Sequence, residues 1–212
     1  MNRRRLLTLP MLGAAAAGVG ALSLPGAAQA APVKIPLIWQ RQQRNYWCGP
    51  AALRIAISAW HDDASDLPSQ TSLASYVGTN SGGTNRHQML SGANHWFGAD
   101  TYDLEDVESR GGLRSSVALR EQFWQRITNG IGAWVPPIVN VVVPAYSPYR
   151  PDDWNNSSEV DHWFVIYGYE PGNRIVYIID PASGLPEFDP DPTYGIRFDY
   201  LCQLVKKAYL HF

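Results

Sequence analysis

The first half of the chain carries apolar residues at the spacing of α-helices. Within the segment 48–60 they stand three and four positions apart, at Ala52, Ile55, Ala56, Ala59 and Trp60. This spacing predicts a helix with one buried face. Further helices are predicted over 69–77, 84–97 and 115–128. Ser69 and Thr84 are the expected N-caps of the first two, because their side chains can accept hydrogen bonds from the first turn.

The second half is dominated by β-branched and aromatic runs, which are typical of strands. The predicted strands are 137–143, 160–169, 174–179, 194–198 and 207–211. The sequence Pro-Gly-Asn at 171–173 predicts a hairpin between two of them. Because helices come first and strands second, the order favours an α+β fold, in which N-terminal helices pack on a mostly antiparallel sheet.

Composition narrows the class of protein. The chain has 212 residues, of which 45% are hydrophobic and 17% charged, as in globular rather than disordered proteins. Its 17 basic and 19 acidic residues give a net charge of −2. This near balance argues against a broad basic surface for nucleic acid.

The N-terminus has the pattern of an export signal. Three arginines, Arg3 to Arg5, precede an apolar stretch rich in small residues, and Ala-Gln-Ala follows at 28–30. We therefore expect residues 1–30 to be a secretory signal peptide and 31–212 to be an exported bacterial domain. That domain would have 182 residues and a net charge of −5, because the signal carries three positive charges.

The type of export stays open. The arginines resemble a twin-arginine signal, and an ordinary secretory signal explains them equally well. No stretch after Ala31 is long and apolar enough to predict a membrane span. The exported domain is therefore expected to be released or to stay associated with the cell envelope.

The two cysteines differ in their surroundings. In an exported protein the default expectation is a disulfide between Cys48 and Cys202. However, Cys48 begins a predicted helix, where the macrodipole and free N–H groups favour a thiolate. Cys202 lies in an apolar context that is typical of a buried, unreactive thiol. Cys48 is thus the candidate nucleophile.

A thiolate nucleophile needs a base or cationic partner. Of five histidines, His162 stands among the first positions of a predicted core strand. It is either a buried histidine whose ring is hydrogen-bonded to the backbone or the partner of the thiolate. Asp180 ends the next strand, 18 residues later, and could orient the imidazole or merely begin a turn. Gln42 and Gln43 precede Cys48 and are candidate amide donors to an oxyanion.

These residues together resemble a papain-like cysteine peptidase. The resemblance rests on Gln42, on the segment Trp47-Cys48-Gly49-Pro50-Ala51-Ala52, on Asp161-His162-Trp163 and on Asp180-Pro181. It is more specific to the C-39-like group, relatives of the bacteriocin-leader peptidases that cut after a double glycine. It spans roughly residues 36–185 and implies the papain-like fold.

The resemblance also implies a role for each residue. Cys48 matches the nucleophile, His162 the base and Asp180 the residue that orients the base. Gln42 matches the oxyanion-hole amide, and it is preferred over Gln43 because the family spacing is six residues before the cysteine. No metal or organic cofactor is expected.

The chain departs from the leader peptidases in one respect. Those enzymes are the front domain of a transporter, whereas this sequence has no further predicted spans and no phosphate-binding G-x-x-x-x-G-K-[ST] motif. It therefore resembles stand-alone exported members, and cleavage after a double glycine is not implied. The expected partner is a peptide or protein substrate, and a monomer is expected.

Two alternatives remain at this point. One is a non-catalytic secreted binding module with a Cys48–Cys202 disulfide, and the other is a papain-like amidase or acyltransferase. Aromatic residues bear on the first alternative. Trp60, Trp124 and Trp163 are expected in the core, whereas Trp39, Trp47, Trp96 and Trp154 could line a groove. The proline-rich and asparagine-rich loop 144–158 is expected to shape one rim of that groove.

Overall fold

The computed structural model describes residues 30–212. The predicted signal peptide, residues 1–30, lies outside the described residues except for Ala30. The helices are α1 (Cys48–Ile57), α2 (Gln70–Val77), α3 (Arg86–Phe97), α4 (Val117–Gly132) and α5 (Phe198–Leu204). The strands are β1 (Val33–Lys34), β2 (Asp103–Asp106), β3 (Ile138–Val143), β4 (Val160–Glu170), β5 (Ile175–Ile179), β6 (Thr193–Arg197) and β7 (Ala208–His211).

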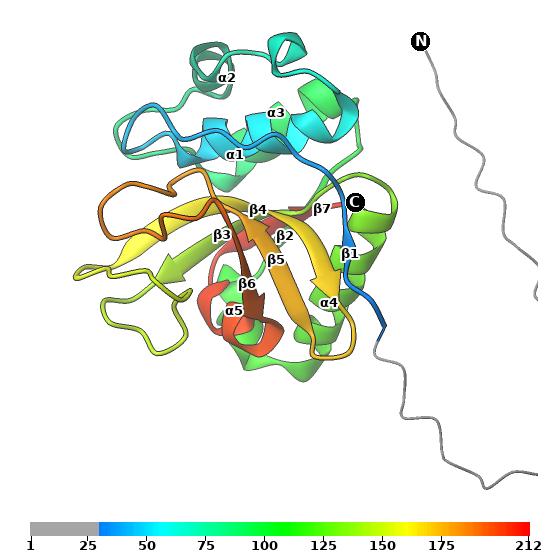
Figure 1. Ribbon diagram of the computed structural model, residues 1–212, viewed down its shortest axis with the longest axis vertical. Coiled ribbons are helices and arrows are strands. Elements are labelled where there is room, and N and C mark those ends of the chain that lie inside the picture. Colours follow the sequence, from blue (N-terminus) through cyan, green and yellow to red (C-terminus); the bar gives the residue numbers. More distant parts are fainter. Residues whose placement is uncertain (1–29) are drawn as a thin grey trace, which may run out of the picture.

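The strands form one antiparallel sheet between two groups of helices. Its order is β2-β7-β3-β4-β5-β6, and β1 pairs with β4. Helices α1 to α3 cover one face, and α4 and α5 lie on the other (Figure 1). The α+β prediction with N-terminal helices on an antiparallel sheet is therefore confirmed.

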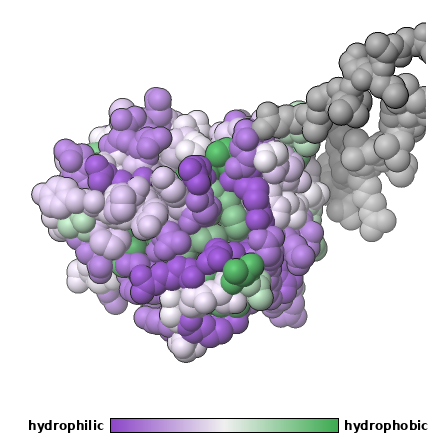
Figure 2. Space-filling model, turned by 90° about the horizontal axis from the view of Figure 1, so that it is seen from below, coloured by the Kyte–Doolittle hydropathy of each residue, from purple (hydrophilic) through white to green (hydrophobic). Residues whose placement is uncertain are grey.

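Alternation along β4 builds a hydrophobic core on each face of the sheet. Trp163 and Val165 pack with α1, whereas Phe164 and Ile166 pack with α4 and α5. Neighbouring residues of a strand point to opposite faces, so one strand serves both cores. Seen from below in Figure 2, the surface of the molecule carries mostly hydrophilic residues.

The capping residues of α2 agree with the prediction, whereas the N-cap of α3 differs from it. Ser69 accepts a hydrogen bond from the backbone of Ser72, and Gly78 ends α2 in the left-handed conformation at φ 69°. Both ends of α2 were predicted. Thr84, by contrast, is not the N-cap of α3. Asn85 caps that helix, in a reciprocal capping box with Gln88.

Two other predicted boundaries are corrected. The last turn of the first predicted helix, Ser58–Trp60, is a 3₁₀-helix, and Trp60 is 51% exposed rather than part of the core. Helix α4 begins at Val117 and continues through Gly130. A Cβ atom at Gly130 would lie 2.6 Å from the carbonyl oxygen of Val135, so this glycine permits close packing and does not end the helix.

Candidate active site

Cys48 is the first residue of α1. Its side chain is 8% exposed, and the helix it begins packs against β4. The next residue, Gly49, has no room for a side chain, because a Cβ atom there would lie 2.6 Å from Oγ1 of Thr84. The Cys-Gly-Pro start therefore lets the helix N-terminus approach the loop before α3 closely, with the thiol at the positive end of the helix dipole.

His162 and Asp180 meet at the end of the sheet. Strand β5 pairs with β4 only from Val165 onward, so His162 lies beyond the end of β5. Asp180 directly follows β5, and its Oδ1 lies 2.8 Å from Nε2 of His162. His162 is 3% exposed and Asp180 is fully buried. The pair is thus held out of water, with the imidazole orientation fixed by a carboxylate.

Electrostatics favour the charged form of His162. Burial of the imidazole lowers its pKa, but the Asp180 carboxylate and, beyond it, Cys48 raise the pKa to about 10. An opposite charge at hydrogen-bond distance favours the imidazolium and here outweighs desolvation. The arrangement can therefore hold the imidazolium of His162 at neutral pH in the pocket that Cys48 also lines.

This raised pKa makes stability depend on alkaline pH. The pKa of His162 is higher in the folded protein than its ordinary 6.5, so its stabilisation is complete below about pH 6.5 and is lost as pH rises through about 10. We expect the urea-unfolding free energy to fall between pH 7 and 10. The double variant His162→Ala/Asp180→Asn should lose this part of the slope, and an equal slope in both proteins would contradict the assignment.

Gln42 lies on the segment that leads into α1. Its backbone N–H donates to the carbonyl of Pro181 at 2.8 Å, which ties this segment to the loop after Asp180. The Nε2 group donates to the carbonyls of Arg44 and Asn45, both at 3.0 Å. Among residues 30–212, the buried Oε1 of Gln42 has no hydrogen-bond partner. Gln43, the other candidate, is exposed.

A buried glutamine at the start of α2 holds the same segment from the other side. Gln70 accepts a hydrogen bond from the backbone N–H of Gln43 and donates to the side chain of Gln40 and the carbonyl of Arg41. Trp39 adds a hydrogen bond from its indole to the carbonyl of Asp180. Sequence reasoning missed Gln70, because nothing local marks a residue whose partners lie about thirty positions earlier.

One pocket brings the predicted residues together. It has a volume of about 300 Å³ and is lined by Gln42, Asn45, Cys48, Val160, Asp161, His162, Leu185, Pro186 and Phe188. Asp180 lies behind His162 and does not line the pocket. Cys48, His162 and Gln42 thus line one pocket, and Asp180 joins this cluster through its contact with His162.

The pocket rim differs from the prediction. The loop 144–158 does not line the pocket; the rim is formed by Leu185, Pro186 and Phe188. The 144–158 loop instead supports that rim from behind, through the N–H of Asn155, which donates to the carbonyl of Glu187. None of the described tryptophans lines the pocket. Trp154 is buried, with its ring edge-on to the imidazole of His162.

Comparisons with known proteins identify the family of this chain. The model of the Peptidase_C39 like family matches residues 33–188. The chain belongs to this family. A search of curated proteins finds no significant match.

Two solved structures resemble this C39-like chain. The peptidase domain of Streptococcus ComA, a bi-functional ABC transporter involved in quorum sensing, has 18% identity and a TM-score of 0.50, over 84% of this chain and 98% of that domain. A double glycine motif protease from an AMS/PCAT transporter, solved with its leader peptide, has 15% identity and a TM-score of 0.48, over 87% and 98%. The ComA domain supports the papain-like fold, and the family supports a function of the cysteine peptidase type.

The two cysteines of the C39-like chain are both free. Cys48 belongs to the core on the α1 face, and Cys202 to the core on the opposite face. Burial raises the pKa of the Cys202 thiol to about 12, so it stays protonated and unreactive. The alternative of a Cys48–Cys202 disulfide is therefore wrong for this structure.

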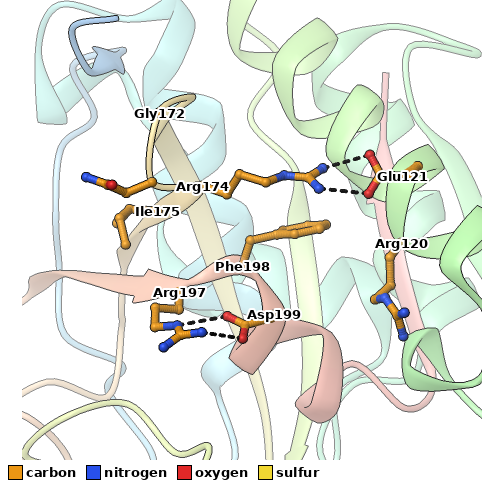
Figure 3. Close-up of a pocket in the computed structure, with 9 residues that line it drawn as sticks. Arg120, Glu121, Gly172, Arg174, Ile175, Arg197, Phe198 and Asp199 are labelled. Atoms are coloured by element: carbon orange, nitrogen blue, oxygen red, sulfur yellow. Dashed lines mark hydrogen bonds and ion pairs between the residues drawn. The ribbon is translucent and has the colours of Figure 1, made fainter. Parts of the chain in front are cut away.

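A larger cavity of about 580 Å³ lies beside the β4–β5 hairpin, away from Cys48. Figure 3 shows two ion pairs in it: Arg174 binds Glu121 through two hydrogen bonds, and Arg197 binds Asp199 likewise, whereas Arg120 is joined to neither carboxylate. The described residues that line it include no cysteine or histidine. Among residues 30–212, no cluster of side chains suits a metal ion. No helix in that range combines the length and apolarity needed to cross a bilayer.

Proposed function

We propose that this chain is an exported cysteine peptidase, with Cys48 as nucleophile, His162 as its acid–base partner and Asp180 as the residue that orients His162. One observation carries the proposal. A cysteine at a helix N-terminus and a buried His–Asp pair with a 2.8 Å hydrogen bond line or support one pocket in a C39-like fold. Nucleophile, base and orienting group are the three parts that acyl transfer needs.

The proposed reaction proceeds in two halves. The Cys48 thiolate attacks the peptide carbonyl, and the imidazolium of His162 donates its proton to the leaving amine as the C–N bond breaks. Water then enters and attacks the acyl carbon while His162 removes one of its protons. The C–S bond breaks, the carboxylic acid leaves, and the Cys48 thiolate and His162 imidazolium are restored. Asp180 keeps the imidazole in place through both halves and stabilises its charged form.

The oxyanion formed in each half needs hydrogen-bond donors. We assign the backbone N–H of Cys48 and the side-chain amide of Gln42 to this role. Since both Nε2 hydrogens of Gln42 reach backbone carbonyls, the amide serves the oxyanion by exchanging the carbonyl of Arg44 or Asn45 for it. The exchange costs least at Arg44, because its carbonyl keeps the hydrogen bond from the backbone N–H of Trp47 and the new acceptor is charged.

Replacing Gln42 tests this assignment. We expect Gln42→Ala to lower kcat by about 10²–10³-fold, since one side-chain donor to an oxyanion contributes about 3–4 kcal/mol to the transition state. KM should change little, because the interaction forms with the charged intermediate. Gln43→Ala is the matched control and should keep activity. A loss of less than about threefold for Gln42→Ala would remove Gln42 from the oxyanion site.

Export is part of the proposal. The three arginines, the apolar stretch and the Ala-Gln-Ala sequence at 28–30 support a cleaved signal. The mature protein in the culture medium or envelope fraction should begin at Ala31. Arg4→Lys/Arg5→Lys should block export only if the twin-arginine route is used.

Peptide hydrolysis is tested directly with a synthetic peptide library and mass spectrometry. The proposal predicts fragment pairs whose masses sum to the substrate plus one water. Ammonia release without chain cleavage would favour an amidase, and products joined to an added amine would favour acyl transfer. An absence of all three, with Cys48 still open to alkylation, would contradict a catalytic role and favour a binding module.

A further inference from the structure

The carboxylate of Asp180 is held by three donors, and two of them, the backbone N–H of Ala182 and the phenol of Tyr194, come from outside the predicted triad. Oδ1 faces Nε2 of His162 and also accepts from the backbone N–H of Ala182 at 2.8 Å. Oδ2 accepts from the phenol of Tyr194 at 2.8 Å. The Tyr194 hydroxyl is the one donor to Oδ2 among the described residues.

The sheet brings Tyr194 to this position. Strand β6 pairs with β5 so that Tyr194 lies opposite Ile178, two residues before Asp180. The tyrosine is partly buried and packs against the core beneath α4 and α5. Its hydroxyl therefore reaches Oδ2 of Asp180 while His162 faces Oδ1, and Tyr194 does not line the pocket that holds Cys48.

We propose that Tyr194 is a positioning residue of this site, whose phenol fixes the plane of the Asp180 carboxylate so that Oδ1 stays directed at His162. The inference rests on the proposed function, because the imidazole orientation matters only if His162 transfers protons. Without the phenol, Oδ1 alone would carry both remaining donors. The carboxylate could then turn about its Cβ–Cγ bond, and the imidazole would lose its fixed orientation.

The surroundings keep this hydrogen bond in one direction. Burial, together with the nearby carboxylates of Asp180 and Asp189, raises the pKa of Tyr194 well above its ordinary value, so the phenol remains a donor. The charged groups that face Asp180 are His162 from β4 and Asp189 from the following loop, with Asp153 and Asp191 beyond Asp189. Apart from His162, these neighbours are acidic, so none of them can replace the phenol as a donor while ionised.

Tyr194→Phe removes only the hydroxyl and keeps the ring. We expect kcat to fall by about tenfold or more, because small misplacements of a catalytic group cost this much. KM should stay within about twofold, since Tyr194 does not touch the pocket. Tyr177→Phe is the matched control, because Tyr177 lies on the neighbouring strand and its hydroxyl bonds Glu170 instead.

A second readout does not depend on peptidase activity. The Nε2–H proton of His162, which donates to Oδ1 of Asp180, should give a low-field proton NMR signal in the wild type and in Tyr177→Phe. In Tyr194→Phe this signal should broaden or move upfield, because the carboxylate is no longer fixed. The same three full-length proteins serve both measurements, with melting temperatures recorded alongside.

The outcomes separate the two levels of the proposal. A fall in kcat together with a changed His162 signal supports positioning by Tyr194. A lower melting temperature with unchanged kcat and an unchanged signal would show a purely structural role and overturn it. If the wild type cleaves no peptide, the proposed function fails, and the NMR comparison alone still decides whether Tyr194 fixes the His–Asp pair.

Discussion

Cys48→Ala is expected to reduce peptide hydrolysis by on the order of 10⁴-fold or more, because it removes the only nucleophile we assign to the pocket. The helix it begins should persist, since alanine fits a position that is 8% exposed at the start of α1. Initial rates from a fluorogenic peptide, corrected for the folded fraction by circular dichroism, measure the effect.

Cys202→Ala is the matched control for this variant. Cys202 is fully buried in the core on the opposite face of the sheet, so its loss should cost about 1 kcal/mol of stability and leave the specific activity of the folded protein unchanged. If Cys48→Ala kept more than about 1% of wild-type activity, the nucleophile would have to be another group.

His162→Ala is expected to lose both activity and stability. Activity should fall on the order of 10⁴-fold, as for other triad members. Stability should fall by about 3–5 kcal/mol, because the fully buried carboxylate of Asp180 loses its cationic partner. Urea unfolding and initial rates on the same samples separate the two effects.

The double variant His162→Ala/Asp180→Asn distinguishes the catalytic from the structural part. Asparagine removes the uncompensated charge while its oxygen can still accept from Tyr194, so the double variant should be more stable than His162→Ala by at least about 1 kcal/mol. Its activity should not recover. Recovery of activity along with stability would mean that His162 acts through the fold and not in the reaction.

Features encoded by neighbouring residues were predictable from the sequence. The caps of α2 follow from Ser69 and Gly78, and the position of Cys48 at a helix start follows from the apolar spacing after it. The approach of His162 and Asp180 was expected because a short hairpin joins their strands. Asp180 nevertheless lies just beyond the paired residues, since β5 ends at Ile179.

Features that depend on distant pairing were not predictable. Strand β2 is charge-rich because it lies at the sheet edge, so it lacks the apolar alternation of a strand. The contact of Tyr194 with Asp180 depends on the register of β6, and the hydrogen bonds of Gln70 depend on where α2 packs. The rim formed by Leu185, Pro186 and Phe188 depends on how a loop folds back over His162.

The most direct test of the account is the site of covalent labelling by an electrophilic peptide probe that traps cysteine peptidases, mapped by peptide mass spectrometry. We predict a single adduct on Cys48 in the wild type, equally in Cys202→Ala, and none in His162→Ala. An adduct on another residue, or a Cys48–Cys202 crosslinked peptide in place of any adduct, would contradict the assignment of Cys48 as the peptidase nucleophile.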